Sequence, residues 1–164
     1  MSLSSVTHDL SKRAPHLTIV ETDTPTPTVQ TAADVHGVAP AQIAKTLAFW
    51  VDNGGAKKPV LIVAGGMARM DNAKVKRALG GKAKMLNAEE VLSVTSHPVG
   101  GVCPFGLPSS LKIYLDESLK QFDELLPAAG SVNSAVRVSL NELAHLTQGE
   151  WVDVAKEVEA EVVT

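Results

Sequence analysis

Apolar residues along the chain fall into short runs of strand length. Two such runs, 46–51 and 59–64, flank the turn sequence Asn-Gly-Gly at 53–55. Asn-Gly between apolar runs favours a tight reversal, so the pattern predicts an antiparallel hairpin over 45–64. Further strands are predicted at 16–21, 82–86, 111–115, 122–126 and 135–138.

Helices are predicted where capping residues mark an end or where apolar positions recur every three or four residues. Thr26 before Pro27 is typical of an N-cap and first turn, and Gly37 of the matching C-terminal stop. Capping boxes at 87–90 and 139–142 predict two more helix starts, the second helix ending at Gly149. The other helical predictions are 4–14, 71–79 and short turns at Pro40 and 116–120.

Short strands interrupted by short helices, without regular βαβ units, predict an α+β fold. We expect a single domain with a strongly curved, barrel-like, mostly antiparallel mixed sheet flanked by short helices. Residues 1–25 are expected to form a helix and strand extension packed on the domain 26–164. The segment 152–164 has no clear period, and a final strand and a frayed helix both fit it.

The composition is that of a globular protein, with 45% hydrophobic and 20% charged residues. No apolar run reaches the roughly 18 residues of a membrane span, and the N-terminus lacks a signal-peptide pattern, so we expect a cytoplasmic protein without a membrane partner. Cys103 is the single cysteine, which excludes an internal disulfide and a cysteine-based zinc cluster. The five histidines show no metal-ligand spacing. We therefore expect neither a metal nor a cofactor.

Charge is distributed unevenly along the sequence. Residues 57–84 contain eight basic residues and one acid, a net charge of +7, whereas 113–164 contain ten acids and three bases, a net charge of −7. A basic third is expected of a protein that contacts a phosphate backbone, and a solvated helix face would give the same pattern. Aromatic residues make up only 4%, which argues against base stacking as the main mode of binding.

The segment 97–107 has three glycines and two prolines within eleven residues. Glycine weakens helices and strands and proline removes a backbone donor, so the segment predicts a shaped loop. The pair Gly100-Gly101 has no side chains, and its backbone N–H groups can approach an oxyanion or a hydroxyl closely. A buried turn between two strands is the alternative for such a loop.

Lys45 lies at the start of an apolar strand, between Ile43 and Leu47. Its ammonium either reaches out to solvent or provides a fixed positive charge in a pocket. A pocket lysine could hold a phosphate, polarise a carbonyl or form a Schiff base.

Four motifs in order, at 37–47, 63–66, 97–106 and 129–131, resemble the YbaK/ProX family. These are free-standing aminoacyl-tRNA deacylases related to the editing insertion domain of bacterial prolyl-tRNA synthetase. Each motif alone is weak, but the ordered set is specific and extends from about Thr26 to Gly149.

The resemblance implies hydrolysis of the ester that joins a wrong small amino acid to the 3′-terminal adenosine of a tRNA, with tRNAPro as the expected carrier. Lys45 matches the family's essential lysine, and Gly100 and Gly101 match the glycines that close on the ester. The implied partners are the acceptor end of an aminoacyl-tRNA and prolyl-tRNA synthetase. A catalytically silent tRNA-binding or synthetase-associated module of the same fold is the alternative, and a small-molecule hydrolase or Schiff-base enzyme is a third.

Further candidates for contact with the substrate lie beside these motifs. Cys103 could be a thiol nucleophile or a packing residue, and His97 a general base or a structural loop residue. Asn133 stands where some branches of the family have a histidine that contacts the substrate, so the resemblance does not transfer a particular amino-acid specificity. The full set of substrate-binding candidates is Thr46, His97, Val102, Cys103, Gly130, Ser131 and Asn133.

Overall fold

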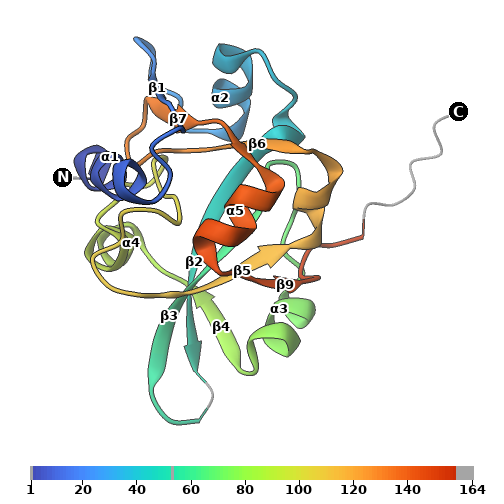
Figure 1. Cartoon of the computed structure of the whole chain (residues 1–164). Coiled ribbons are helices and arrows are strands. Elements are labelled where there is room, and N and C mark those ends of the chain that lie inside the picture. Colours follow the sequence, from blue (N-terminus) through green and yellow to red (C-terminus); the bar gives the residue numbers. More distant parts are fainter. Residues whose placement is uncertain (1, 53, 158–164) are drawn as a thin grey trace, which may run out of the picture.

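A computed structural model describes residues 2–52 and 54–157 (Figure 1). The helices are α1 (Ser2–Arg13), α2 (Val29–His36), α3 (Asn72–Leu79), α4 (Ala88–Thr95) and α5 (Leu140–Thr147), with 3₁₀ turns η1 (Pro40–Gln42) and η2 (Glu117–Gln121). The strands are β1 (Ile19–Glu21), β2 (Ile43–Asp52), β3 (Lys57–Gly65), β4 (Lys82–Met85), β5 (Lys112–Asp116), β6 (Glu124–Pro127), β7 (Ser134–Val136), β8 (Val138–Ser139) and β9 (Glu150–Val152).

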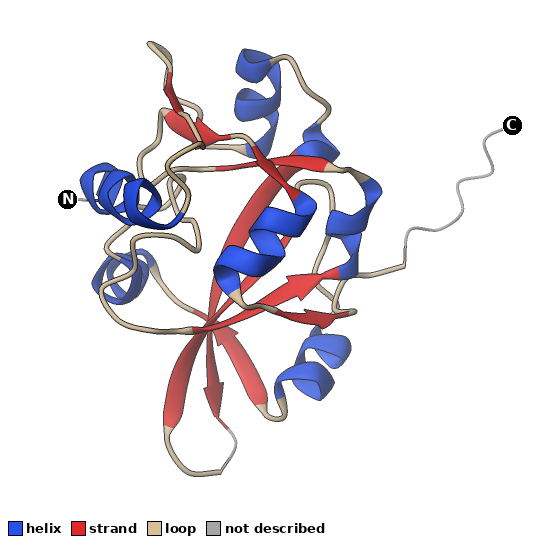
Figure 2. Cartoon of the chain, viewed as in Figure 1, coloured by secondary structure: helices blue, strands red, loops and turns tan. Residues whose placement is uncertain are grey.

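The main sheet is built around the long β2–β3 hairpin. Its strand order is β8-β6-β2-β3-β5-β9, and β4 also pairs with β2. The pairs β2–β3, β2–β4 and β6–β8 are antiparallel, while β6 on β2, β5 on β3 and β9 on β5 are parallel. The sheet curls into a half-barrel, and the helices surround it (Figure 2). The predicted α+β class, the curved mixed sheet and the hairpin are confirmed.

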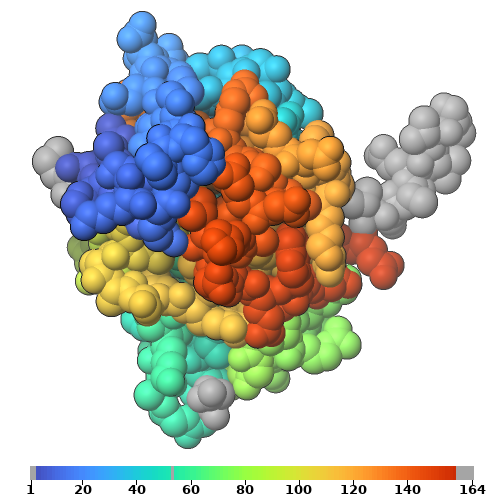
Figure 3. Space-filling model, in the orientation of Figure 1, coloured from blue at the N-terminus to red at the C-terminus, as the bar shows by residue number. Residues whose placement is uncertain are grey.

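Apolar side chains pack on both faces of this sheet. The larger core lies inside the curl and includes Leu61 and Leu115 from the sheet and Val6 and Leu10 from α1, all at most 2% exposed. The N-terminal helix therefore shares the main core, and it packs against the segment around Gly106, whose N–H donates to Asp9 (Figure 3). On the other face, α3 packs in a smaller core with residues of β2 and β3. Within the described residues no helix is long and apolar enough to cross a membrane.

Three predicted helix ends differ in detail from the structure. Thr28, not Thr26, is the N-cap of α2, and the Thr26 hydroxyl instead donates to the Val132 carbonyl. At α5 the Ser139 hydroxyl accepts from the Glu142 N–H, but the Glu142 carboxylate binds His16 and the Ser139 hydroxyl, so this capping box is half formed. A residue in the left-handed conformation, Gln148, ends α5 one position before the predicted glycine.

The other elements agree with the sequence pattern to within a few residues. The Asn87–Glu90 capping box and the Gly37 C-cap are present. The predicted strand 135–138 is broken at Arg137 into β7 and β8, which pair with different strands. The first residue of the segment 152–164 is the last residue of β9. The described part of the segment ends at residue 157, and 158–164 lie outside the described residues.

Candidate active site

The candidate site begins with an opening along one edge of β2. One edge of the strand pairs with β3 throughout, but the other pairs with β6 only at Ile43 and Ala44 and with β4 only from Phe49 onward. Residues 45–48 therefore have no strand partner on that edge in the described chain. The Ala48 carbonyl accepts from the Leu86 N–H across this edge. Because alternate residues of a strand direct their backbone groups the same way, the N–H and C=O of Thr46 also face the opening.

A pocket of about 320 Å³ lies over this opening, between β2, α2, α4, β7 and the glycine-rich loop. Its wall is mostly small or apolar: Val29, Ala32, Ile43, Ala44, Leu47, Ala48, Met85, Leu86, Val91, Val99, Val102, Leu126, Ala128 and Ala135. The polar side chains among the lining residues are Thr26, Thr28, Lys45, Thr46 and Ser134. A cavity of this kind fits a small, uncharged group that is oriented by a few hydrogen bonds.

Thr46 has the one orphaned hydroxyl among the described lining residues. The residue is 9% exposed, and its Oγ1 has no hydrogen-bond partner within the protein. A buried hydroxyl without a partner costs about 1–3 kcal/mol, so a position of this type is favoured when a ligand completes it. Thr46 thus presents a hydroxyl and the two backbone groups described above at the same place.

Lys45 is half-buried and lies among the pocket-lining residues. Its ammonium donates to the carbonyls of Gly66, at 3.3 Å, and Ala68, in the loop that follows β3. Burial lowers the pKa of Lys45, and the nearby charge of Arg69 lowers it further. The two carbonyls occupy two of the three N–H donors of the ammonium. Lys45 therefore offers a fixed donor and a positive charge rather than a freely moving side chain.

The two loop glycines pack closely against other segments. Gly100 lines the pocket, has a φ of +92°, and a Cβ there would meet Pro27 at 3.2 Å. A Cβ on Gly101 would lie 2.8 Å from the backbone N of Ser131. The Gly101 N–H donates to the Pro98 carbonyl, and the Gly101 carbonyl accepts from Gly130. Because the Gly101 N–H is already used, Gly100 is the candidate donor to a ligand, and Gly101 fixes the loop against the 130–134 turn.

His97 and Cys103 lie behind the loop, both fully buried and outside the pocket lining. The loop folds back and brings the Cys103 Sγ to 3.7 Å from the His97 Nε2. That nitrogen donates to the Phe105 carbonyl at 2.7 Å, so it carries the proton and does not act as a base for the thiol. Burial raises the pKa of Cys103 to about 12 and lowers the pKa of His97. The geometry supports packing and loop-fixing roles for this pair.

Residues 130–134 form a hydrogen-bonded turn beside the pocket. The Ser131 hydroxyl contacts the hydroxyl of Ser134 at 2.6 Å and the Asn133 Oδ1 at 3.1 Å, and the Asn133 amide donates to the Thr22 carbonyl at 2.9 Å. Gly130, Ser131 and Asn133 are absent from the pocket lining, whereas the next residue, Ser134, is part of it.

The structure thus places Lys45, Thr46, Gly100 and Val102 around one pocket and the other candidates behind its wall. It adds three hydroxyl residues that the sequence reasoning missed: Thr26, Thr28 and Ser134. Their only signal in the sequence was local, since the two threonines precede a helix and Ser134 follows a Gly-Ser pair. Local chemistry of that kind predicts caps and turns rather than a binding site.

Residues 23–146 match the model of the aminoacyl-tRNA editing domain. This match spans well over half of the chain and includes every candidate residue above. The protein belongs to the aminoacyl-tRNA editing domain family.

Individual relatives agree with this assignment. The chain is 42% identical to the "Uncharacterized protein YwhH" of Bacillus subtilis, over 97% of this chain and 100% of the relative. It is 26% identical to the "Putative Cys-tRNA(Pro)/Cys-tRNA(Cys) deacylase EbsC" of Enterococcus faecalis, over 76% and 75% of the two chains. A solved structure described as a "putative trans-editing enzyme for prolyl tRNA synthetase" is 32% identical and superimposes with a TM-score of 0.87 over 95% of this chain and 98% of the other.

Proposed function

We propose that the protein is a hydrolase that edits in trans, cleaving the ester of a mischarged aminoacyl-tRNA that bears a small amino acid, with tRNAPro as the carrier. The observation that carries the proposal is the pocket at the open edge of β2. It combines a small apolar wall with Lys45, the orphaned hydroxyl of Thr46 and the Gly100 backbone. Membership of the editing family supplies the substrate class.

In this proposal the pocket acts by positioning. The Lys45 ammonium holds the terminal phosphate or the ester carbonyl, and the Gly100 N–H and the backbone of Thr46 orient the aminoacyl group. Water adds to the carbonyl carbon, the bond to the ribose oxygen breaks, and that oxygen takes up the proton. An aminoacyl ester is already activated, so a protein nucleophile is unnecessary. One well-placed donor to a developing oxyanion contributes about 10²–10³ in rate.

Two features of the pocket support an amino acid whose side chain is small and carries no positive charge. Its volume of about 320 Å³ is shared between the amino acid and the terminal ribose, and its polar lining contains no acid among the described residues. Alanine and cysteine fit these limits. Such a substrate places the protein in the cytoplasm, with prolyl-tRNA synthetase as a candidate partner.

A deacylation panel tests the proposal. Wild type and Lys45→Ala are incubated with tRNAPro charged with alanine, cysteine, serine or proline, and the loss of ester is followed over time. We expect rapid hydrolysis of one small non-cognate ester by wild type and a loss of about 10²–10³ in Lys45→Ala. Circular dichroism checks that the variant is folded. A wild-type protein inert on all mischarged small-amino-acid tRNAs would refute the proposal.

A catalytically silent tRNA-binding module is the second candidate, and the cationic residues of 57–84 favour it. It predicts salt-dependent tRNA binding without turnover, and binding unchanged by Lys45→Ala. The lowered pKa of Lys45 gives a Schiff-base enzyme some support as well. Failure of borohydride to trap a carbonyl substrate on Lys45 would exclude the Schiff-base hypothesis.

A further inference from the structure

Six of the eight basic residues in the segment 57–84 fall into two sets on opposite faces of the sheet. In the hairpin, Lys57 lies opposite Asp52, which in turn lies opposite Lys82 of β4. Directly opposite residues in antiparallel strands project from the same face of a sheet. Asp52 is an even number of residues from Thr46, so its side chain is on the same face as that of Thr46. Lys57 and Lys82 therefore project from the face that carries the side chains of Thr46 and Ala48, which we call the pocket side; Lys45, an odd number of residues from Thr46, projects from the other face.

Lys84 belongs to the same set. It lies opposite Trp50, which is also an even number of residues from Thr46. The Trp50 indole N–H donates to the Glu90 carboxylate at 2.9 Å. The hydrogen bonds from the Asn87 N–H and from Trp50 lower the pKa of Glu90, and the nearby charges of Lys57 and Lys84 lower it further. This contact with α4 is an independent sign that both lysines lie on the face where α4 packs.

Three of the remaining five cations lie on the opposite face. Lys58 is opposite Val51, whose side chain packs in the smaller core with α3. Lys76 and Arg77 are exposed in the last turn of that helix. These three residues, Lys58, Lys76 and Arg77, form a set of equal charge on the face opposite to the side chain of Thr46.

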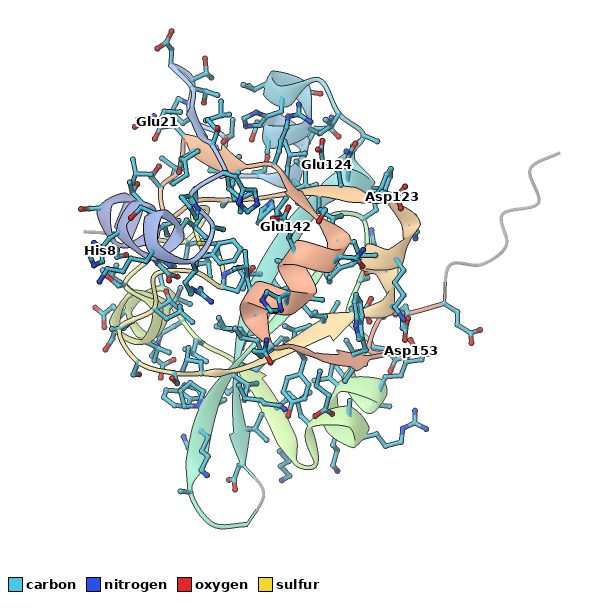
Figure 4. All side chains as sticks on the ribbon, viewed as in Figure 1. His8, Glu21, Asp123, Glu124, Glu142 and Asp153 are labelled. Atoms are coloured by element: carbon cyan, nitrogen blue, oxygen red, sulfur yellow. The ribbon has the colours of Figure 1, made fainter. Side chains whose placement is uncertain are left out.

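The pocket-side lysines are available to a ligand. All three are exposed, and none forms an ion pair with another described residue within 4.0 Å. Asp52, the acid between Lys57 and Lys82, accepts a hydrogen bond from the Gly54 N–H. The acids labelled Asp123, Glu124 and Glu142 in Figure 4 lie around β6 and α5, away from the projecting end of the hairpin.

β4 connects two of these lysines, Lys82 and Lys84, to the pocket. Met85 and Leu86 line the pocket, and Lys84 precedes them in the chain. Each two-residue step along a strand covers about 6.7 Å, so Lys84 and then Lys82 lie at successive steps outward from the pocket wall. A polyanion with a negative charge at each unit of its backbone, and with its last unit in the pocket, would pass over Lys84 and then Lys82.

We propose that Lys57, Lys82 and Lys84 form a phosphate-binding face that holds the backbone of the tRNA acceptor arm while its aminoacylated end occupies the pocket. The proposal rests on the proposed function for the identity of the polyanion. Lysine binds phosphate as a point charge without reading bases, so the face positions the tRNA and does not select its sequence.

The test compares two triple variants with the same change in charge. Lys57→Gln/Lys82→Gln/Lys84→Gln removes the pocket-side set, and Lys58→Gln/Lys76→Gln/Arg77→Gln removes the opposite set. Binding of uncharged tRNAPro is measured by fluorescence anisotropy at several salt concentrations, and kcat/KM is measured with aminoacyl-tRNA and with a minimal aminoacyl-adenosine ester. Thermal unfolding checks that both variants are folded.

We expect the pocket-side variant to reduce the steepness of the plot of log affinity against log salt by about 2–3, which is close to one unit per lost phosphate contact. The variant of the opposite set should keep a slope near that of wild type. The pocket-side variant should lose at least about tenfold in kcat/KM on aminoacyl-tRNA and retain wild-type activity on aminoacyl-adenosine. Equal slopes in the two variants, or an unchanged slope in the pocket-side variant, would overturn the proposal. If wild type binds tRNA through this face but hydrolyses no ester, the proposed function fails and the binding face stands.

Discussion

The glycine-rich loop has two halves with opposite characters. Residues 98–102 approach the pocket, have inert side chains and contact other segments through their backbone. Residues 103–106, together with His97, turn inward; His97, Cys103 and Phe105 are all 0% exposed. The reactive residue types are therefore in the half that is sealed in the core, and a glycine without a side chain, Gly100, lines the pocket.

This contrast indicates what the pocket requires. A hydrolase of activated esters needs a carbonyl held in a fixed position more than it needs a nucleophile. The buried His97 ties its own end of the loop to the Phe105 carbonyl, which is consistent with that requirement. The glycines then allow close approach at the other end. Substitutions in the two halves should therefore differ in what they damage.

The largest effect is expected for Gly101→Ala. The added Cβ would lie 2.8 Å from the Ser131 backbone, so the loop must move away from the 130–134 turn. We expect deacylation to fall by about 10²–10³ and the free energy of unfolding by about 1–3 kcal/mol. Single-turnover kinetics and denaturant unfolding measure the two. Gly55→Ala is the matched control, because a Cβ there meets nothing within 4 Å. Activity unchanged in Gly101→Ala would show that the loop position does not matter.

The second effect concerns Lys45 and the pH at which its charge is lost. Its pKa is lowered in the folded protein, so the ammonium loses its proton at a lower pH than an exposed lysine. After subtraction of the uncatalysed rate, we expect activity to fall on the alkaline side below pH 10.5. Arg69→Gln removes a nearby positive charge, raises the pKa of Lys45 and moves this alkaline limb to higher pH. A limb that does not move would contradict a role for the charged ammonium.

His97→Gln should lower stability more than it changes the chemistry. Loss of the buried hydrogen bond to Phe105 is expected to cost about 1–3 kcal/mol. Burial lowers the pKa of His97, so below about pH 6.5 the unfolded chain takes up a proton that the folded protein resists. Wild type should therefore lose stability as the pH falls from 6.5, and the variant should lose less. Denaturant unfolding at pH 7.5 and 5.5 measures this, with His145→Gln as an exposed control. Equal pH dependence in wild type and His97→Gln would refute it.

The smallest effect on activity is expected for Cys103→Ala. With a pKa of about 12, only about one thiol in 10⁵ is ionised at pH 7. Activity should stay within about threefold of wild type, while the small cavity lowers the free energy of unfolding by about 1 kcal/mol. Iodoacetamide should leave native wild type active, and rapid inactivation would contradict the buried position of the thiol.

The fold was predictable because its signals are local. The Asn-Gly-Gly turn, the capping residues and the apolar runs each act over a few residues, and they yielded the hairpin, most of the helices and the α+β class. The errors have the same origin. Both Thr26 and Thr28 can cap α2, and the long-range bond from Thr26 to Val132 decides between them. Likewise, the contact of Glu142 with His16 bridges residues far apart in sequence and displaces half of a capping box.

The site was predictable only in part. Lys45 and the glycine pair stand out because each is unusual for its place in the sequence. Thr46 gained its significance from the gap between β4 and β6 on the edge of β2, and a gap in pairing leaves no local pattern. His97 and Cys103 were attractive candidates by residue type, whereas their burial depends on α1 and α4 packing over the loop. Residue type predicts chemistry, but the direction in which a loop faces is a property of the whole fold.

The most direct measurement compares wild type, Gly101→Ala and Cys103→Ala in single-turnover hydrolysis of alanyl-tRNAPro and cysteinyl-tRNAPro. If the pocket acts by positioning, wild type and Cys103→Ala hydrolyse the same ester at similar rates, and Gly101→Ala is slower by at least about a hundredfold. A folded Cys103→Ala that is inactive beside an active Gly101→Ala would contradict catalysis by positioning. A wild type inert on both esters would contradict the proposed substrate.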